Sequence, residues 1–424
     1  MALTRNLHRV TSAATGDTTA FVGGVLTVDL AGAAALVRDP ALAEVRVSWV
    51  SPGDPVRIVK VLDAVQPRTK GPGGGGIFPG LLGPAVPQGT GVTHVLADTA
   101  VVVAGFLPRA QEAVVDMSGP AAELSPLATT HNLVIEFTPA SEARWEDVDL
   151  ALRRGSLSLA ARLAETVLGV EPDEVVTLPG LGEDDPAAKG NGHLPRVGAV
   201  TNLQTQGAFK DTFVYGRSFA GSFPLLLDAN ELEDGAVVSG QFGHPSLKNP
   251  TWIHQNHPVV AALRARHGTE VAFAGVILCP EPVDQNGKVL LSAATARLAA
   301  AAGWDGAVVT KEGGGNADAD MALKMDELEA LGLTAVGLFA EMAGADGTGP
   351  SVVVPPERAT AMVSTGNYDQ RLALPAMERS LGGDTLTLVG CPAADAVELP
   401  AAVIYASLSP LGWGRLTCGA GVGQ

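Results

Sequence analysis

The feature that most constrains the fold is the alternation of strand and helix patterns over residues 197–364. Short apolar runs rich in β-branched residues predict strands at Val197–Thr201, Ala236–Ser239, Ala272–Leu278, Gly306–Thr310, Thr334–Leu338 and Ala361–Ser364. Stretches with helical spacing lie between them, at Val259–His267, Ala293–Ala302 and Met321–Leu331. Alternation of this kind is typical of a parallel, doubly wound sheet, so we expect an α/β fold here.

Polar loops follow several of these predicted strands. One loop, after the strand predicted at 236–239, carries His244, His254 and His257 within fourteen positions. Imidazole is the side chain that changes charge near neutral pH, so this loop is the first candidate for chemistry. In a parallel sheet the loops after the strands' carboxyl ends lie at one edge, where ligands bind. We therefore expect three loops to converge there, at residues 240–257, 311–320 and 341–346.

The first part of the chain has mostly strand patterns. The β-branched and apolar stretches are Ala20–Leu30, Val45–Val50, Thr99–Ala104 and Leu133–Phe137. Helices are expected only at Gly32–Arg38 and Trp145–Val167. The glycine run Gly71–Gly80 lacks the Lys-Ser/Thr pair that completes a phosphate-binding P-loop, so it predicts a plain loop. We expect a β-rich N-terminal domain over residues 1–170.

A change in composition marks the expected domain boundary. Pro, Gly, Asp and Glu dominate residues 171–196, which predicts a linker. With 424 residues the chain is too long for one ordinary core. A second, α/β domain is expected over residues 197–424.

Charge and cysteine content exclude several classes of function. The net charge of −17 argues against nucleic acid and against an anionic membrane surface as partners. No apolar run is long enough to span a bilayer, and the first residues lack a signal peptide's apolar core. The cysteines Cys279, Cys391 and Cys418 form no CxxC pair. These features favour a cytoplasmic protein in a reducing compartment.

Three kinds of functional site are considered, each against a structural role for the same residues. Glu312, Asp318 and Asp320 could bind a divalent cation, but the two aspartates stand beside a predicted helix start, so helix capping is favoured. His254 and His257 have a spacing that can share a metal on a helix, but a following proline biases His257 out of helix, so no metal is expected. A serine hydrolase is not indicated, because the Gly-x-Ser-x-Gly motif is absent.

Nine short segments together resemble a known family. They are Pro72–Gly80, Thr93–Leu96, Asp116–Pro120, Leu203–Gly207, Asp211–Gly216, Lys248–Trp252, Ala265–Gly268, Glu312–Asn316 and Leu374–Met377. In sequence and order they resemble the α/β proprotein subunit of component B of glycine, sarcosine and betaine reductases. The D-proline reductase proprotein is similar more distantly. The resemblance covers nearly the whole chain.

The resemblance implies a pyruvoyl chemistry. Proproteins of this family cut themselves before a cysteine in the central loop, and that residue becomes a pyruvoyl group. Its carbonyl can form an imine with a substrate amine and accept electrons, which assists reductive cleavage of a C–N bond. A partner subunit with a selenocysteine or cysteine receives the carbon fragment.

This sequence departs from the family pattern at the processing junction. The family has Ser-Gly-Asn-Cys, whereas this chain has Ser239-Gly240-Gln241-Phe242. Phenylalanine cannot form the ester intermediate that self-cleavage needs. A second family cysteine aligns with Ser246, but a proline precedes it and its register does not suit the junction. We therefore expect an intact chain with no pyruvoyl group and no other cofactor.

The resemblance and the loop chemistry give one set of expected site residues. The expected catalytic residues are His254, His244, Ser246 and Lys248. The expected substrate-binding residues are Gln204, Gln206, Asn249, Thr251, His257, Glu312 and Asn316. For His254 the alternative is a structural histidine bonded to the backbone.

Three functions remain open at this point. The chain is a subunit of a reductase that handles a small amine or carboxylate, with a thiol- or selenol-bearing partner in a hetero-oligomer. Alternatively, it is a non-catalytic scaffold for such a partner. The third possibility is a repurposed enzyme of specialised metabolism that uses the histidine loop.

Overall fold

The computed structural model describes residues 2–73, 75–108, 110–180, 194–205, 212–240, 244–409 and 411. Three expectations fall outside these residues: the role of Gln206, the junction residues Gln241 and Phe242, and the position of Cys418.

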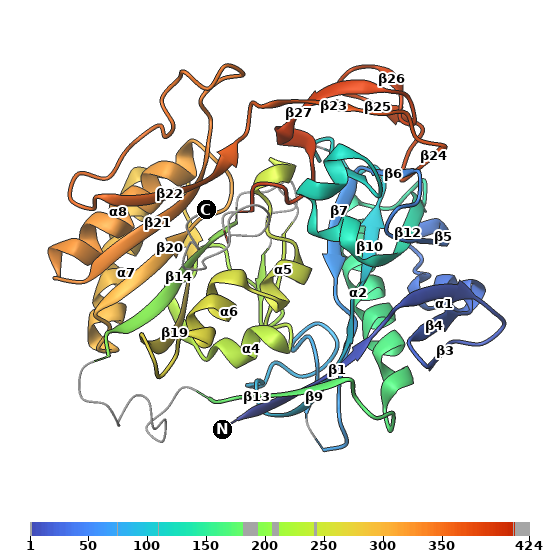
Figure 1. Ribbon diagram of the computed structural model, residues 1–424, viewed down its shortest axis with the longest axis horizontal. Helices are drawn as coiled ribbons and strands as arrows, with labels where there is room; N and C mark the ends of the chain where they lie inside the picture. Colours follow the sequence, from blue (N-terminus) through green and yellow to red (C-terminus); the bar gives the residue numbers. More distant parts are fainter. Residues whose placement is uncertain are drawn as a thin grey trace.

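A six-stranded sheet forms the framework of the second half (Figure 1). Its order is β17 (Leu225–Leu227), β19 (Ala272–Glu281), β14 (Arg196–Gln204), β20 (Gly306–Thr310), β21 (Thr334–Glu341) and β22 (Ala361–Asn367). All neighbours are parallel except β17, which is antiparallel to β19. Five of the predicted strands therefore lie in one mostly parallel sheet, as expected.

The sixth predicted strand was assigned to the wrong sheet. The run at 236–239 contains only a two-residue strand, β18 (Val237–Val238), which pairs antiparallel with β15 (Phe213–Val214). With β16 (Arg217–Ser218) these strands form a separate small sheet. A short apolar run shows that its residues are buried, but it carries no information about the strand that pairs with it.

Helices cover both faces of the six-stranded sheet. On one face, α6 (Pro258–Ala265) packs through Val259, Val260 and Leu263 on a core that includes Ala199 of β14. On the other, α7 (Gln285–Ala301) and α8 (Asn316–Ala330) pack on a core that includes Val200, the next residue of β14. Successive strand side chains point to opposite faces, so both faces of this apolar strand are buried.

The strand order defines a topological switch point. From β14 the chain first adds β19 on one side, and then adds β20, β21 and β22 on the other. This is the order found in flavodoxin-type sheets, which bind ligands where the direction of winding reverses. In this protein the switch point lies between the carboxyl ends of β14 and β20.

The described part of the N-terminal half contains several further sheets and the helices α1 (Leu30–Val37) and α2 (Trp145–Ala164) (Figure 1). One sheet has the order β13 (Glu174–Leu178), β1 (Leu3–Arg9), β9 (Gly91–Ala97), β8 (Arg68–Lys70); another has β5 (Leu42–Val50), β12 (His131–Pro139), β10 (Thr99–Ala104), β7 (Val61–Val65). A small sheet is formed by β2 (Ser12–Thr15), β4 (Val25–Val28) and β3 (Ala20–Val22). The helices α1 and α2 lie at or near the predicted positions and pack on a shared core. Residues 174–178, within the predicted linker, form β13 and pair with β1.

The last part of the chain returns to the N-terminal half. There β24 (Arg379–Leu381) pairs with β6 (Val56–Val59), which also pairs with β11 (Val114–Asp116). The remaining elements there are β23 (Arg371–Leu374), β25 (Thr385–Leu386), β26 (Cys391–Pro392), β27 (Val397–Pro400) and the 3-10 turn η5 (Ala401–Val403). The fully buried Arg57 bonds Asp116 and also donates to the carbonyls of Pro375, Ala393 and Asp395. The described strands after β22 thus pair outside the six-stranded sheet, and β24 joins a sheet of the N-terminal half.

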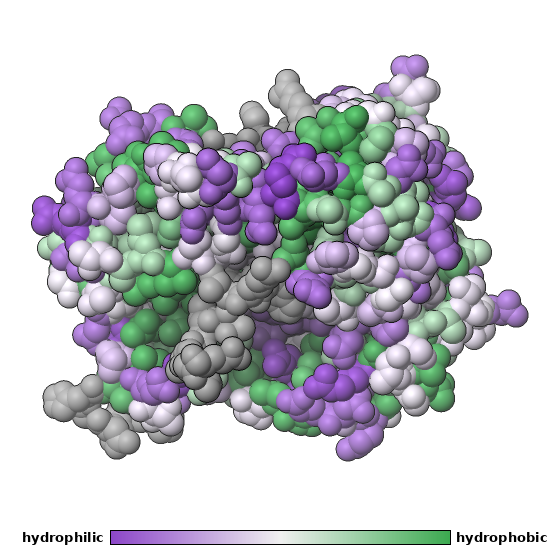
Figure 2. Space-filling model, turned by 45° about the horizontal axis from the view of Figure 1, so that its top comes forward, coloured by the Kyte–Doolittle hydropathy of each residue, from purple (hydrophilic) through white to green (hydrophobic). Residues whose placement is uncertain are grey.

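The surface is mixed in polarity. Figure 2 shows hydrophilic and hydrophobic residues interspersed over the face that it displays. Among the residues that the structure describes, no helix combines the length and the apolar character needed to cross a membrane.

Candidate active site at the sheet's switch point

Glu312 joins the loops that meet at the switch point. It follows β20, its side chain is fully buried, and its Oε2 accepts the backbone N–H of Gln204 at 2.8 Å. Its Oε1 accepts the backbone N–H of Asn249 at 3.3 Å. A buried carboxylate is stable only when it is hydrogen-bonded or paired. Glu312 thus ties the end of β14 to the segment that precedes α5 (Thr251–Gln255).

His254 of α5 lies beside this carboxylate. Its Nε2 is 3.6 Å from Glu312 Oε1, so the expected proximity of the two loops is present. The side chain is 1% exposed, and neither ring nitrogen has a hydrogen-bond partner within the described part of the chain. The separation of 3.6 Å is too long for a hydrogen bond. The alternative of a histidine bonded to the backbone therefore has no support among these contacts.

Other buried polar atoms without described partners gather at the same edge. They are both amide atoms of Asn202, Gln204 Oε1, Ser246 Oγ and Asn249 Nδ2. Asn202 and Gln204 end β14, and the Asn249 Oδ1 atom accepts from Ser409 at 2.5 Å. Most buried polar groups in native proteins are paired, so a concentration at one sheet edge calls for an explanation. These atoms are the donors and acceptors that a small polar ligand could use.

The loop at 341–346 also reaches this edge. A Cβ atom on Gly314 would lie 2.5 Å from the sulfur of Met342 and 3.4 Å from Leu247. The glycine loop after β20 is thus packed between the 341–346 loop and the 3-10 turn η4 (Pro245–Leu247). A side chain at position 314 would require the Met342 side chain to move.

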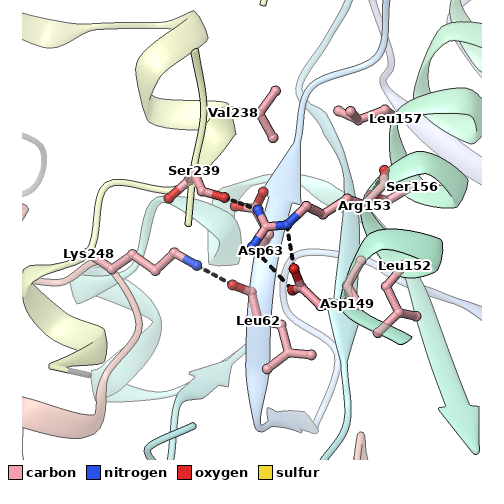
Figure 3. A pocket seen from close by; sticks show the side chains of 11 residues that line it. Leu62, Asp63, Asp149, Leu152, Arg153, Ser156, Leu157, Val238, Ser239 and Lys248 are labelled. Carbon is pink, nitrogen blue, oxygen red and sulfur yellow. Dashed lines mark hydrogen bonds and ion pairs between the residues drawn. The ribbon is translucent and has the colours of Figure 1, made fainter. Parts of the chain in front are cut away.

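Lys248 is directed elsewhere, toward β7. Figure 3 shows its ammonium donating to the carbonyl of Leu62. Burial lowers the pKa of Lys248 to about 8, with the nearby Asp63 acting in the opposite direction. Lys248 shares a small cavity with Arg153, whereas His254 lines another. The structure thus does not bring these two expected catalytic residues into the same cavity.

Arg153 and Thr251 hold the backbone at Ser239, just before the residues predicted to replace a processing junction. Arg153 pairs with Asp149 and donates to the carbonyl of Ser239 (Figure 3). The Ser239 N–H bonds the hydroxyl of Thr251 at 2.9 Å, and that hydroxyl donates to Asp63 at 2.6 Å. Thr251, expected to bind substrate, is thus engaged in fixing this backbone.

His244 and His257 have defined partners away from His254's ring. The His244 Nδ1 atom bonds the hydroxyl of Tyr368 at 2.9 Å, and its backbone N–H bonds Gln111. His257 caps α6 through Nδ1 and bonds Thr201 through Nε2 at 2.9 Å. Burial lowers the pKa of His257 to about 3, so this ring is neutral at pH 7. His257 is therefore a satisfied helix cap.

Lysines neutralise the aspartates that were weighed as cation ligands. Lys311 pairs with Asp318, and Lys324 pairs with Asp320 at 2.6 Å. The favoured capping role was wrong, because Gly315 occupies the N-cap of α8 and no side chain caps it. Within the described ranges no group of three or more His, Cys, Asp or Glu is arranged to hold a metal ion. Asn316, the first residue of α8, is exposed.

Glu281, at the end of β19, was missed from the sequence. Burial raises its pKa to about 8, with further contributions from Asp320 and Glu312. Its Oε1 accepts the backbone N–H of Glu312 at 3.1 Å. The sequence does contain a signal for it, because Glu281 is an acidic residue directly after an apolar strand run next to the switch point. The predicted strand ended three residues too early to include it.

His254 also lines a partly open cavity of about 320 Å³. Gln255, Asn256 and His257 line it as well, so the cavity runs along the end of α5. The candidate active site therefore combines the Glu312 carboxylate, 3.6 Å from the His254 ring, with a cavity lined by the residues at the end of α5.

Comparisons with a family model and with individual proteins all match the same family. Residues 1–417 match the family described as glycine/sarcosine/betaine reductase component B subunits. The chain is 38% identical over 376 residues to the glycine reductase complex component B subunits alpha and beta of Peptoclostridium acidaminophilum, covering 86% of this chain and 87% of that protein. The corresponding protein of Acetoanaerobium sticklandii is 35% identical over 415 residues, covering 95% and 96%. The sarcosine reductase complex component B subunit alpha of P. acidaminophilum is 34% identical over 376 residues, covering 87% and 86%. No solved structure matches the chain.

Proposed function

Because the chain belongs to the family of glycine/sarcosine/betaine reductase component B subunits, we propose that it serves in reductive cleavage of a C–N bond without a pyruvoyl group. The substrate is a small amino-acid-like molecule, and a partner subunit supplies a thiol or selenol. The observation that carries the proposal is the buried polar edge between β14 and β20, where His254 lies 3.6 Å from Glu312.

The residues present do not fit a pyruvoyl group. Such a group is formed from a cysteine or serine side chain at the cleaved bond, and position 242 is phenylalanine. The two described cysteines belong to other elements, Cys279 to β19 and Cys391 to β26. Cys279 is fully buried beside Thr295 of α7. The proposed reaction therefore uses no carbonyl cofactor made from this chain.

The chain's own groups can support the cleavage as an acid–base site. The partner's thiolate or selenolate forms a bond to the substrate carbon, and the electron pair of the C–N bond leaves on nitrogen. When the amine is bound unprotonated, His254 donates the proton that the departing nitrogen gains. Glu312 stabilises the imidazolium before that transfer. A second thiolate on the partner then attacks that sulfur or selenium, so that a disulfide or selenenyl sulfide forms, the bond to carbon breaks, and the carbon fragment takes up a proton and leaves. An external dithiol reduces the disulfide or selenenyl sulfide back to the thiol and selenol.

An intact-mass measurement tests the unprocessed state. The purified chain is expected to have the mass of one polypeptide, because Phe242 cannot form the ester that leads to cleavage. Two fragments cut between residues 241 and 242 would refute the proposal's premise.

The reaction itself is tested by amine release. The purified chain and its co-purified thiol- or selenol-bearing subunit are incubated with glycine, sarcosine or betaine and a dithiol reductant. Release of ammonia, methylamine or trimethylamine supports the proposal. A stable complex with that subunit but no release of amine would instead indicate a scaffold.

A further inference from the structure

The cavity beside His254 has an unusual set of charged walls. It lies between β1, α4 (Ala229–Glu233), α5 and α6, and we call it the arginine cavity. Arg5 and Arg264 line it together with Glu233 and His254. Its volume of about 320 Å³ is at the small end of ligand sites, so it suits a molecule of a few heavy atoms.

Three guanidinium groups surround the single carboxylate of Glu233. The ion-pair distances from this carboxylate are 3.1 Å to Arg5, 2.6 Å to Arg68 and 3.1 Å to Arg264. Burial alone would raise the pKa of Glu233, but Arg68, Arg5 and Arg264 together hold it below its usual value. Glu233 is therefore ionised, and it can neutralise only one of the three.

The neighbouring acids do not remove the positive excess. Asp234 is paired with Lys70, so that pair contributes no net charge. Asp228, the N-cap of α4, is the other acid that acts on Arg264. Counted over the described residues alone, Arg5, Arg68 and Arg264 against Glu233 and Asp228 leave one positive charge beside the cavity.

The three arginines differ in how many of their nitrogens are already bonded. Arg264 donates through Nη1 to Glu233 and through Nη2 to Asn230. Arg68 is fully buried and all three of its nitrogens are bonded, to Gln66, Glu233, Gln255 and Asn256. The Nε of Arg5, in contrast, is buried and has no hydrogen-bond partner among the described residues. Burial lowers the pKa of Arg264, and the nearby Arg5 lowers it further. An anion between Arg5 and Arg264 would relieve both conditions.

We propose that the arginine cavity is an oxyanion subsite, which holds the carboxylate of the small substrate between Arg5 and Arg264. Guanidinium groups bind carboxylates and phosphates in the same forked geometry, so the oxyanion is the chemistry recognised. His254 lines the same cavity, so a molecule anchored there would lie against the end of α5. The assignment to the substrate rests on the proposed function; the oxyanion site does not.

Calorimetric titration of the purified chain tests the subsite. The ligands are acetate, glycine, sarcosine, betaine and inorganic phosphate, each at constant ionic strength set with chloride. Saturable binding of a carboxylate is expected, and Arg264→Gln should weaken it at least tenfold because a charge-assisted bidentate contact is lost. The matched control is Arg162→Gln, an arginine of α2 that is 70% exposed and pairs only with Glu165, which should leave affinity unchanged.

Two further variants protect the test against simple unfolding. Arg5→Gln removes the more exposed arginine, and Arg264→Lys keeps the charge while losing the fork; each is used only with the melting temperature measured beside it. Phosphate that binds in preference to carboxylates, and is lost in Arg264→Gln, supports the oxyanion site with phosphate as its source. No saturable binding of either class, or equal affinity in a folded Arg264→Gln variant, overturns it.

The measurement separates this inference from the proposed function. Binding is read on the chain alone and needs no turnover. If a carboxylate binds but no amine is released with the partner, the reductase function fails and the subsite stands. If amine is released with a KM that Arg264→Gln and Arg5→Gln leave unchanged, the subsite fails and the function stands.

Discussion

At the scale of single residues, His254 and His257 show how position decides the role of a side chain. Both stand in one short segment, three positions apart. His257 has partners at both ring nitrogens, whereas the described residues offer His254 none. The two histidines should therefore respond to substitution in opposite ways.

His254→Gln should abolish amine release and leave thermal stability nearly unchanged. The loss of a general acid lowers turnover by about 100-fold or more, and no described hydrogen bond is removed with the ring. Turnover and the melting temperature are measured on the same preparation. A variant that is both stable and active would remove His254 from the mechanism, and a large loss of stability would indicate a structural histidine.

His257 should make the protein less stable in acid. The folded state takes up the His257 proton only near pH 3, whereas the unfolded chain takes it up near pH 6.5. The unfolded state thus binds more protons between these values, and the free energy of unfolding falls as pH falls below about 6.5. Between pH 6.5 and pH 5, His257 should lower the free energy of unfolding by about 2 kcal/mol.

Denaturant unfolding of wild type and His257→Gln at pH 7.5, 6.5 and 5.0 measures this contribution. The comparison is needed because Glu281, with its pKa raised to about 8, acts in the opposite direction. Glu281 holds its proton more tightly when folded, so its stabilising contribution is lost as pH rises toward 8. Since both proteins contain Glu281, only the histidine term differs. Equal pH slopes in the two proteins would contradict the assignment.

At the scale of elements, α5 is too short to hold its own position. It has five residues, yet it carries His254. Arg68 of β8 donates to the carbonyl of Gln255 and to the side chain of Asn256, which immediately follows α5. A brace from a distant strand thus sets where the histidine lies.

Arg68→Gln should destabilise the protein by about 3–5 kcal/mol, because the buried Gln66 side chain, the carbonyl of Gln255 and the side chain of Asn256 would all lose the donor that bonds them. Arg162→Gln, which breaks an exposed pair, should cost at most about 1 kcal/mol. Chemical denaturation of both variants measures the contrast. Similar losses from the two substitutions would show that the buried arginine is not a brace.

Hydrogen bonds from distant parts of the chain hold Ser239 and Gly240, which precede the proposed processing junction. Ser239 is held by Arg153 and Thr251, and the N–H of Gly240 bonds the hydroxyl of Thr212 at 3.3 Å. The double variant Gln241→Asn, Phe242→Cys should therefore recover some self-cleavage, seen as two fragments by mass spectrometry. Phe242→Ala is the control and should stay intact, since alanine has no nucleophile. An intact double variant would mean that these supports are not sufficient.

At the scale of the whole molecule, the candidate site depends on contacts between distant parts of the chain. Glu312 bonds Gln204 across 108 residues, and Arg5 pairs with Glu233 across 228. Residues 371–411 pack back on the N-terminal half through β24 and the contacts of Arg57. These contacts cross the boundary that the sequence predicts between residues 170 and 197.

The sequence by itself determined the parallel sheet, its covering helices and the family, because each depends on local patterns. Strand and helix periods at Ala272–Leu278 or Met321–Leu331 are properties of neighbouring residues, and the family segments are short motifs in order. The sequence also indicated that His254 and Glu312 would meet, since loops after parallel strands share an edge. Only the tertiary structure decided that Lys248 is directed to Leu62, that His257 is a satisfied cap, and that Arg5 lies at a cavity with Arg264. Those partners are separated by up to hundreds of residues, and the pairing of side chains at that distance is set by packing, which no local period records.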